Sequence, residues 1–232
     1  MSTITKQVSG TLAESRLFRK PRVLWQRNQQ DWSLPLTKPQ KVRVGLYVIL
    51  RDYADGLFPP RFVDQRTTHD AERAFDLVLP GISEEQARVL GLTKPYWTAH
   101  SLQQFLPNLA RLAAEFERLA IQPPQSILEL GCGKGWMAEA LAQMGYRVLG
   151  TTIAETDVEH ARLRVESLRS KGIPAELSFR ACPMESVDEE VGDLDTFDAA
   201  FVYEALHHAH DWRRALTSVG NCLRPNGWLI LA

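Results

Sequence analysis

The stretch Ile127-Leu128-Glu129-Leu130-Gly131-Cys132-Gly133-Lys134-Gly135 decides the fold of this chain. The apolar run before the first glycine predicts a buried strand, and the segment after the last glycine has apolar residues at helical spacing. A strand, a glycine-rich turn and a helix N-terminus in this order bring main chain close to a bound nucleotide. Glycine is needed there because a Cβ would block both the backbone angles and the contact.

Two common nucleotide motifs do not fit these glycines. The dinucleotide motif Gly-x-Gly-x-x-Gly/Ala needs a small residue where this chain has Trp136. The phosphate-binding P-loop has Ser or Thr after its lysine, whereas Gly135 follows Lys134. What remains is Glu-x-Gly-x-Gly-x-Gly, with Glu129 two residues before the first glycine.

This pattern resembles the first motif of the class I S-adenosylmethionine (SAM)-dependent methyltransferases. SAM suits it because its amino-acid end needs a carboxylate for the ammonium and N–H groups for the carboxylate, and because SAM has no phosphates. The resemblance implies SAM as the cofactor and S-adenosylhomocysteine as its product. It assigns the methionine end to Glu129, Gly131, Gly133 and Gly135. A chance glycine-rich turn in another α/β protein is the alternative.

Length and composition set the class of protein to expect. The 232 residues can hold one large domain, or one domain with a substantial extension. A net charge of −1 gives no general attraction to nucleic acid or to an anionic membrane. Cys132, Cys182 and Cys222 are odd in number and widely spaced, which fits a reducing cytoplasm. With no secretory signal and no apolar run of roughly 18 residues, we expect a soluble cytoplasmic protein that binds neither nucleic acid nor membrane.

Residues 1–95 are expected to form an N-terminal extension that covers the substrate or the edge of a sheet. The polar, Pro/Gln-rich residues 1–40 favour loops or a loosely docked arm. The apolar side chains of Val42, Val44, Leu46, Val48 and Leu50 alternate, which predicts a strand. Helices are predicted at 70–79, from a capping box at 83–86 to near Gly91, and at 101–120 with a kink at Pro107.

Residues 96–232 are expected to form the SAM-binding core. Strands are predicted at 126–130, 146–150, 175–180, 197–203 and 228–231, with helical segments between them. This alternation predicts an α/β fold with a doubly wound, mostly parallel Rossmann-like sheet. Ligands bind such sheets outside the carboxyl ends of the strands.

The predicted sheet ends after its fifth strand, whereas class I methyltransferase sheets normally continue with a sixth and a seventh. These two strands are therefore expected to be missing at the C-terminus. Since an open edge invites aggregation, we expect strand 42–50 to fill part of the gap, or a second subunit to do so in a homodimer.

The end of the second predicted strand departs from the common class I pattern, in which an acid holds the ribose hydroxyls. The segment Gly150-Thr151-Thr152-Ile153-Ala154 is instead similar to the Gly-x-Thr-Leu-Ser segment of cyclopropane fatty acid synthase and related C-methyltransferases. That resemblance implies cofactor contacts at Thr152, Ile153 and Asp157. The alternative is a strand-end threonine and a first-turn aspartate favoured by the helix dipole.

The third predicted strand ends near Cys182, where many class I methyltransferases have an acid for the adenine amino group. Met184 suits a purine face, and Glu185 could reach the amino group. An ordinary loop with weak adenine recognition is the alternative.

Residues 197–211 resemble the fourth motif of the small-molecule methyltransferases related to ubiquinone biosynthesis, roughly Phe-Asp-x-Val followed by Glu-x-Leu-x-His. The segment Leu223-Arg224-Pro225-Asn226-Gly227-Trp228 is similar to their Leu-Lys-Pro-Gly-Gly turn. These resemblances imply a small-molecule acceptor and add Tyr203 to the cofactor contacts.

Histidines cluster beside the expected acceptor. A neutral imidazole can take a proton from a hydroxyl or an amine, so His208, or else His207, is the candidate general base. On one helical turn, Glu204, His207 and His208 could instead face a divalent metal ion. That set resembles the Glu-x-x-Glu-His triad of small-RNA 2′-O-methyltransferases, with His207 replacing the second Glu. Solvated or structural histidines are the third interpretation.

The leading hypothesis is SAM-dependent methyl transfer to a hydroxyl of a small molecule, such as a sugar or another secondary metabolite. The rivals are a degenerate SAM-binding domain with a regulatory or partner role, and a different SAM-dependent reaction. The missing acids after the second and third strands favour the degenerate domain. Candidates for a substrate lining, with burial in a core as the alternative, are Trp25, Trp32, Tyr47 and Tyr53.

Overall fold

The computed structural model describes residues 18–30, 36–54, 65–73, 84–191 and 196–232. The chain divides into two compact units. The N-terminal unit is Met1–Asp64 with Leu79–Ile82, and the sheet unit is Gln65–Val78 with Ser83–Ala232. The sheet unit therefore includes α4 (Gln65–Arg73) and α5 (Glu84–Thr93), both of which precede residue 96.

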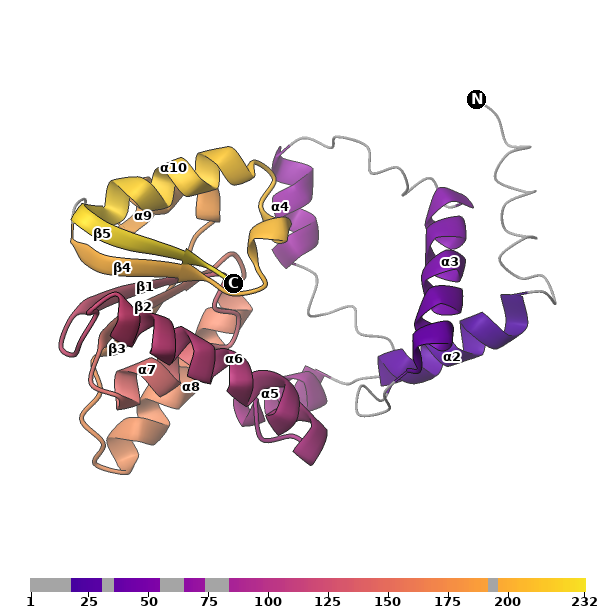
Figure 1. Ribbon diagram of the computed structural model, residues 1–232, viewed down its shortest axis with the longest axis horizontal. Helices are drawn as coiled ribbons and strands as arrows, with labels where there is room; N and C mark the ends of the chain where they lie inside the picture. The colour runs from indigo at the N-terminus through magenta and orange to yellow at the C-terminus, as the bar shows by residue number, and fades with distance from the viewer. Residues whose placement is uncertain (1–17, 31–35, 55–64, 74–83, 192–195) are drawn as a thin grey trace. The chain divides into compact units, whose positions relative to one another are not determined.

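Five parallel strands form the sheet, in the order β3-β2-β1-β4-β5 (Figure 1). Their bounds are β1 (Ser126–Leu130), β2 (Arg147–Thr152), β3 (Leu177–Ala181), β4 (Phe197–Val202) and β5 (Leu223–Leu231). Leu130 pairs with Thr151 on one side and with Val202 on the other. The strand order reverses between β1 and β4, which makes their carboxyl ends the topological switch point where ligands bind.

Helices cover both faces of this sheet, which confirms the doubly wound α/β fold (Figure 1). They are α6 (Ala99–Arg118), α7 (Trp136–Gln143), α8 (Glu155–Ser170), α9 (Val187–Val191) and α10 (Trp212–Cys222). On one face Phe116 of α6 and Met137 of α7 pack with Phe201 of β4. On the other face Val219 of α10 packs with Leu128 of β1. Because β4 is covered from both sides, all of its residues are buried.

The predicted strands of the core are confirmed, with small shifts of their ends and one larger difference at β5. Residues Pro225-Asn226-Gly227, predicted as a turn before the strand, lie inside β5 as an irregularity. Leu223 pairs with Phe197, whereas Trp228 pairs with Ala199.

The predicted strand at 42–50 is wrong, because these residues belong to α3 (Lys38–Ala54) of the N-terminal unit. Val44 and Tyr47 are buried, whereas Val42 and Leu46 are exposed. Buried positions three residues apart are a helical pattern. The alternation misleads because Val42, Leu46 and Leu50 are also four residues apart, which is the spacing of a second stripe on a helix. Pairing of this segment with β5 as a strand is thereby excluded.

Loops were also the wrong prediction for residues 19–30, which form α2 (Arg19–Gln30). The ring of Tyr47 packs against Phe18 and Trp25, with centroids 6.2 and 6.3 Å away. Tyr47 and Trp25 are therefore packed aromatics of the N-terminal unit. Trp32 and the side chain of Tyr53 lie outside the described residues.

The helices before the sheet begin and end slightly away from their predicted bounds. α4 begins before the helix predicted at 70–79, and the last six residues of that prediction lie outside the described residues. α5 continues past Gly91, and α6 contains Pro107. Thr98 caps α6, since its Oγ1 accepts a hydrogen bond from Ser101 N at 3.1 Å. None of the described helices combines the length and apolar character needed to cross a bilayer.

Candidate active site

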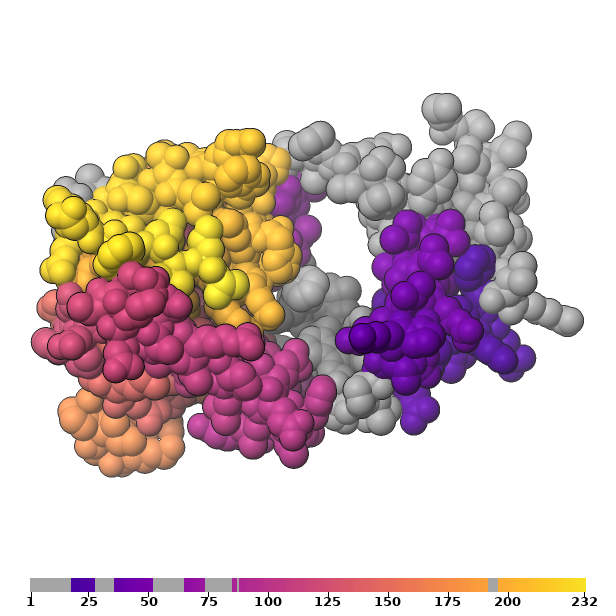
Figure 2. All heavy atoms as spheres, in the orientation of Figure 1, coloured from indigo at the N-terminus to yellow at the C-terminus, as the bar shows by residue number. Residues whose placement is uncertain are grey.

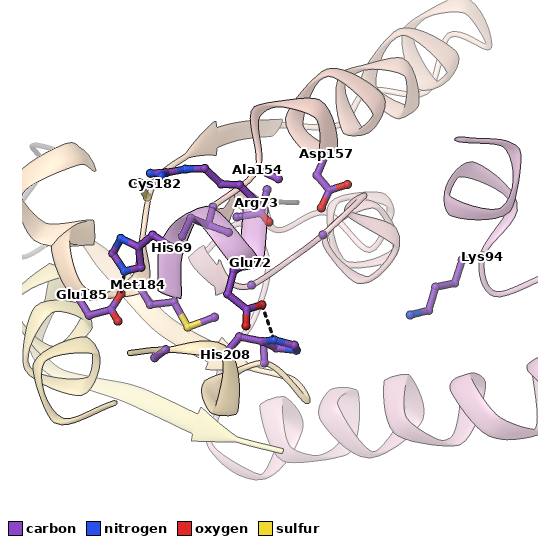
Figure 3. A pocket seen from close by; sticks show the side chains of 16 residues that line it. His69, Glu72, Arg73, Lys94, Ala154, Asp157, Cys182, Met184, Glu185 and His208 are labelled. Atoms are coloured by element: carbon purple, nitrogen blue, oxygen red, sulfur yellow. Dashed lines mark hydrogen bonds and ion pairs between the residues drawn. The ribbon is translucent and has the colours of Figure 1, made fainter. Parts of the chain in front are cut away.

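A pocket of about 310 Å³ lies at the carboxyl ends of the strands (Figure 3). Its walls come from the turns after β1 and β2, the loops after β3 and β4, helix α4, and Lys94 before α6. Ligand pockets in proteins typically measure roughly 300–1,000 Å³. The pocket therefore has the size and the position that the topology predicts for a small-molecule site.

Three left-handed glycines shape the turn after β1: Gly131 (φ +69°), Gly133 (φ +50°) and Gly135 (φ +73°). A Cβ on Gly131 would meet the Ala205 Cβ at 2.3 Å, and one on Gly135 would meet the Phe179 ring at 2.4 Å. A Cβ on Gly133, which lines the pocket, would meet no described atom within 4 Å. Protein atoms thus fill the space beside the first and third glycines, while the second leaves main chain open to a ligand.

The carboxyl group of Glu129 is buried at the end of β1, and its Oε2 has no hydrogen-bond partner among the described residues. Burial raises the pKa of Glu129 to about 8, although a main-chain hydrogen bond from Ala138 and the positive charge of Lys94 lower it. A nearby cationic group favours the ionised form of such a carboxyl. Glu129 is not itself part of the pocket wall, but its unused oxygen fits the ammonium group of a ligand.

Lys94 is a pocket residue that the sequence analysis missed. Its Nζ lies 4.3 Å from the centroid of the Phe105 ring and 5.8 Å from that of Trp136. Aromatic faces attract cations, so the two rings help to hold the ammonium group in place. Only the isolated lysine before Pro95 was visible in the sequence, and no motif marks it.

The end of β2 places Thr152, Ile153 and Asp157 together on the pocket wall. Thr152 and Asp157 are buried, and Asp157 Oδ1 lies 3.5 Å from Lys134 Nζ. Asp157 is also in the first turn of α8, where the helix dipole favours a carboxylate. The position fits both a ribose contact and a helix-end charge, so the ribose role stays a prediction.

The loop after β3 brings Cys182 and Met184 to the pocket. Burial raises the pKa of the Cys182 thiol to about 12, so this residue presents a neutral thiol where an acid was expected. Glu185 is buried, with Oε1 accepting from Asp211 N at 3.1 Å and Oε2 lying 3.3 Å from His69 Nε2. Oε1 of Glu185 thus joins the loops after β3 and β4, whereas His69 Nε2 makes no hydrogen bond among the described residues and is only a close neighbour of Oε2.

Of the histidines after β4, His208 lines the pocket (Figure 3). Its Nδ1 lies 2.7 Å from Glu72 Oε2 on α4. His207 is exposed and outside the pocket wall, with its ring centroid 4.1 Å from that of His208. The geometry therefore brings one of the two candidate bases to the pocket.

The helical turn assumed for a metal site is wrong. Glu204 has a left-handed backbone (φ +48°), and the 3₁₀ turn that follows covers Leu206–His208 alone. Glu204 therefore does not share a helical turn with the two histidines. The described part of the chain contains no group of three His, Cys, Asp or Glu side chains arranged to hold a metal ion.

Tyr203, predicted as a cofactor contact, lies outside the pocket wall. Its hydroxyl accepts a hydrogen bond from Asn108 Nδ2 at 2.6 Å, and its ring packs edge-on against Trp136. Gly135 is also outside the wall and shapes the turn instead.

Helix α4 supplies three further pocket residues that the sequence analysis missed: His69, Glu72 and Arg73. The sequence predicts a helix in this region but carries no motif that assigns it to the site. The i, i+3 spacing of His69 and Glu72 is the one local signal, since such positions share a helix face.

A family model matches part of the sheet unit. Residues 128–231 match the methyltransferase domain family. This segment is similar to a methyltransferase domain. Its five-stranded parallel sheet and glycine turn are those of the class I SAM-dependent type, which confirms the resemblance found in the first and fourth motifs.

Relatives of the methyltransferase domain include ubiquinone biosynthesis O-methyltransferases. The protein from Bordetella avium is 30% identical over 160 residues, which are 66% of this chain and 63% of that protein. The protein from Chromobacterium violaceum is 28% identical over 142 residues, which are 61% of this chain and 58% of that protein. The chain thus spans less than two thirds of the length of these relatives.

A solved structure shares the fold of the domain. A candidate sarcosine dimethylglycine methyltransferase from Galdieria sulphuraria has a TM-score of 0.50 and 19% sequence identity. The match covers 56% of this chain and 47% of that chain. At this identity the similarity supports the fold alone.

Proposed function

We propose that this chain transfers the methyl group of SAM to a hydroxyl group of a small molecule, such as a sugar or another secondary metabolite. The proposal depends above all on one observation: the open main chain at Gly133 and the imidazole of His208 line the same pocket. The first provides a cofactor cradle, and the second provides a proton acceptor. The O-methyltransferase names of the Bordetella avium and Chromobacterium violaceum relatives support oxygen as the acceptor atom.

The methionine end of SAM is assigned to the turn after β1. Glu129 has an unused, buried carboxyl oxygen that would accept a hydrogen bond from the ammonium group. Lys94, on the pocket wall, would face the carboxylate, and the turn at Gly133 lets the main chain approach. Opposite charges on the two protein side chains match opposite charges on this end of the cofactor.

The adenosine end is assigned to the residues after β2 and β3. Thr152 and Asp157 provide a hydroxyl and a carboxylate for the ribose diol, and Ile153 lies between them in the chain. Met184 provides a polarisable thioether for a purine face. Glu185 is the acid on the pocket wall after β3, and its Oε1 already accepts a hydrogen bond from Asp211 N, so only its Oε2 would remain for the adenine amino group.

SAM supplies an electrophilic methyl group on a positively charged sulfur. His208 would take the proton of the acceptor hydroxyl at Nε2, since its Nδ1 contacts Glu72. Proton transfer to a positioned side chain typically contributes roughly 10²–10⁴-fold to a rate, and holding the two reactants in line contributes more. His207 is not assigned this role, because it is exposed and lies outside the pocket wall.

Calorimetric titration with SAM and S-adenosylhomocysteine tests the cofactor assignment. We expect binding by the intact chain and its loss in Gly133→Arg, whose side chain would fill the open space beside the turn. A chain that binds neither compound, or a variant that binds as well as the parent, would contradict the proposal.

Methyl transfer from radiolabelled SAM to a panel of phenols, sugars and aliphatic alcohols tests the reaction. Turnover should fall by roughly 10²–10⁴-fold in His208→Ala. The matched control is His207→Ala, which removes the neighbouring ring outside the pocket and should retain turnover. Equal losses in both variants, or undiminished turnover in His208→Ala, would remove His208 as the base.

A SAM-binding domain without turnover is the second candidate. The neutral Cys182 thiol and the engaged Glu185 favour it, because both replace the acid expected near adenine. This candidate predicts measurable SAM binding with no transfer to any acceptor in the panel. A different SAM-dependent reaction would instead consume SAM without methylating these hydroxyls.

A further inference from the structure

One face of α4 meets the loops that follow β3 and β4. Thr68, His69 and Glu72 lie at spacings of one, three and four residues, which places His69 and Glu72 on adjoining positions of a helix surface. Each contacts a different loop residue: Thr68 Oγ1 lies 3.1 Å from His210 Nδ1, and His69 Nε2 lies 3.3 Å from Glu185 Oε2. Several contacts therefore fix this helix against the pocket.

The third contact of α4 reaches the proposed base. Glu72 Oε2 lies 2.7 Å from His208 Nδ1, and both residues line the pocket (Figure 3). An ionised carboxylate only accepts hydrogen bonds, so the proton of this bond belongs to Nδ1 of the imidazole. In a neutral imidazole the other nitrogen, Nε2, is then the unprotonated one. The contact thus selects the tautomer in which Nε2 can accept a proton.

The other charged group of α4 on the pocket wall does not compete for Glu72. Arg73 Nη1 donates to Asp70 Oδ1 at 3.0 Å, so the guanidinium is paired within the helix. Asp70 is exposed and outside the pocket wall. Glu72 therefore faces His208, whereas Asp70 on the same helix does not, which makes Asp70 a matched control for changes at Glu72.

We propose that Glu72 is the positioning residue for His208, holding it as the Nδ1–H tautomer, in which Nε2 is the unprotonated nitrogen. This inference rests on the proposed role of His208 as the base. It assigns α4 a part in the chemistry, because the base is oriented only when this helix is docked. Glu72 lies outside residues 128–231, which match the methyltransferase domain family, so the domain alone does not supply it.

Nitrogen-15 NMR of the histidine rings in the full chain tests this proposal without any acceptor. At a pH where the rings are neutral, we expect His208 to show a protonated Nδ1 and an unprotonated Nε2. The resonance is assigned by its loss in His208→Gln. A wild-type His208 found mainly as the Nε2–H tautomer would overturn the proposal by itself.

Matched carboxylate-to-amide variants on α4 sharpen the test. Glu72→Gln should shift His208 away from the Nδ1–H tautomer, because an amide can donate to Nδ1 as well as accept from it. Asp70→Asn makes the same chemical change on the exposed side and should leave the tautomer as in the wild type. An unchanged tautomer in Glu72→Gln, or the same shift in both variants, would overturn the proposal. If Glu72→Gln does not fold, Glu72→Asp replaces it in this test. Asp keeps the negative charge but shortens the side chain, so it should also shift His208 away from the Nδ1–H tautomer.

SAM titration of the same variants separates this inference from the proposed function. Glu72→Gln should bind SAM with an affinity within about threefold of the wild type, since Glu72 is not assigned to the cofactor; a larger loss would make Glu72 a cofactor contact and overturn the positioning role. Loss of SAM binding in the wild type would refute the proposed function. A wrong tautomer with intact SAM binding would refute only the role of Glu72.

Discussion

The two units of the chain differ in how they bury apolar side chains. The sheet unit packs helices on both faces of a five-stranded sheet and has two extended cores. The described part of the N-terminal unit contains α2 and α3, drawn in indigo and violet in Figure 2. These helices bury Val44 and Tyr47, while Val42, Leu46 and Ile49 stay exposed. Stability scales with the apolar area removed from water. We therefore expect the sheet unit to set the stability of the pocket, and changes in the N-terminal unit to act locally.

The largest expected effect is the loss of a core ring in the sheet unit. Phe116 is fully buried, with ring centroids 5.3 Å from Tyr146 and 6.4 Å from Phe201. Phe116→Ala should lower the free energy of unfolding by about 3–5 kcal/mol, measured by denaturant titration. Leu106→Ala, a change on the exposed side of the same helix, is the control and should have a much smaller effect. Similar effects would contradict the proposed division between core and surface.

Substitution of two glycines in the turn after β1 should affect different properties: Gly131 the stability of the sheet unit, and Gly133 the binding of SAM. Gly131→Ala combines a left-handed backbone with a Cβ 2.3 Å from Ala205 Cβ, so it should destabilise the sheet unit by about 2–4 kcal/mol. Gly133→Ala carries only the backbone strain, about 1–2 kcal/mol, because its Cβ points into open space. It should instead weaken SAM binding in calorimetry. Equal loss of stability in both variants would show that Gly133 is packed like Gly131.

The buried carboxyl of Glu129 predicts a pH-dependent stability. Its pKa in the folded protein is about 8, above the ordinary value of 4.5, so between these values the folded state keeps a proton that the unfolded state releases. The contribution of Glu129 to the free energy of unfolding is therefore fully present below pH 4.5 and is lost as the pH rises towards 8. Between pH 5.5 and 6.5 the loss is at most about 1.4 kcal/mol.

Thermal unfolding of the wild type and Glu129→Gln over this pH range checks that sign. Other titrating groups are common to both proteins, so their difference isolates Glu129. Wild-type stability should fall with rising pH relative to Glu129→Gln. A constant difference between the two proteins would show that Glu129 is ionised in the folded state throughout the range.

The smallest expected effect sharpens the assignment of α3 as a helix. Leu46→Ala should change the free energy of unfolding by less than about 0.5 kcal/mol, because its side chain is exposed. Tyr47→Ala should loosen the contacts with Phe18 and Trp25 and speed proteolysis of the N-terminal unit. Neither should move the unfolding midpoint of the sheet unit. A large effect of Leu46→Ala would mean that the exposed stripe is covered in solution.

The sheet is predictable from the sequence because each of its elements has a recognisable local sequence pattern. β1 is apolar on both faces and is followed by glycines that the left-handed turn requires. The sequence pattern of α3 is ambiguous, because its two apolar stripes together also produce the alternation that is typical of a strand. Periodicity alone therefore fails where a helix carries apolar residues on more than its packed side.

The candidate site is predictable where it depends on strand ends. Gly133, Thr152 and His208 each follow a predicted strand, and parallel strands bring such positions to one edge. Lys94 and Glu72 are different, because they come from segments before the sheet and reach the pocket only through tertiary packing. No local pattern in the sequence specifies contacts of that kind.

The contact between Glu72 and His208 also has a consequence for the order of folding. The two residues are 136 positions apart in the chain, and joining the ends of an unstructured loop of that length costs about 4 kcal/mol in chain entropy. The sheet must therefore place His208 before α4 can dock at little cost, and we expect α4 to acquire protection from hydrogen exchange last. During synthesis and refolding the chain would pass through a species that already has its cofactor cradle but lacks an oriented base.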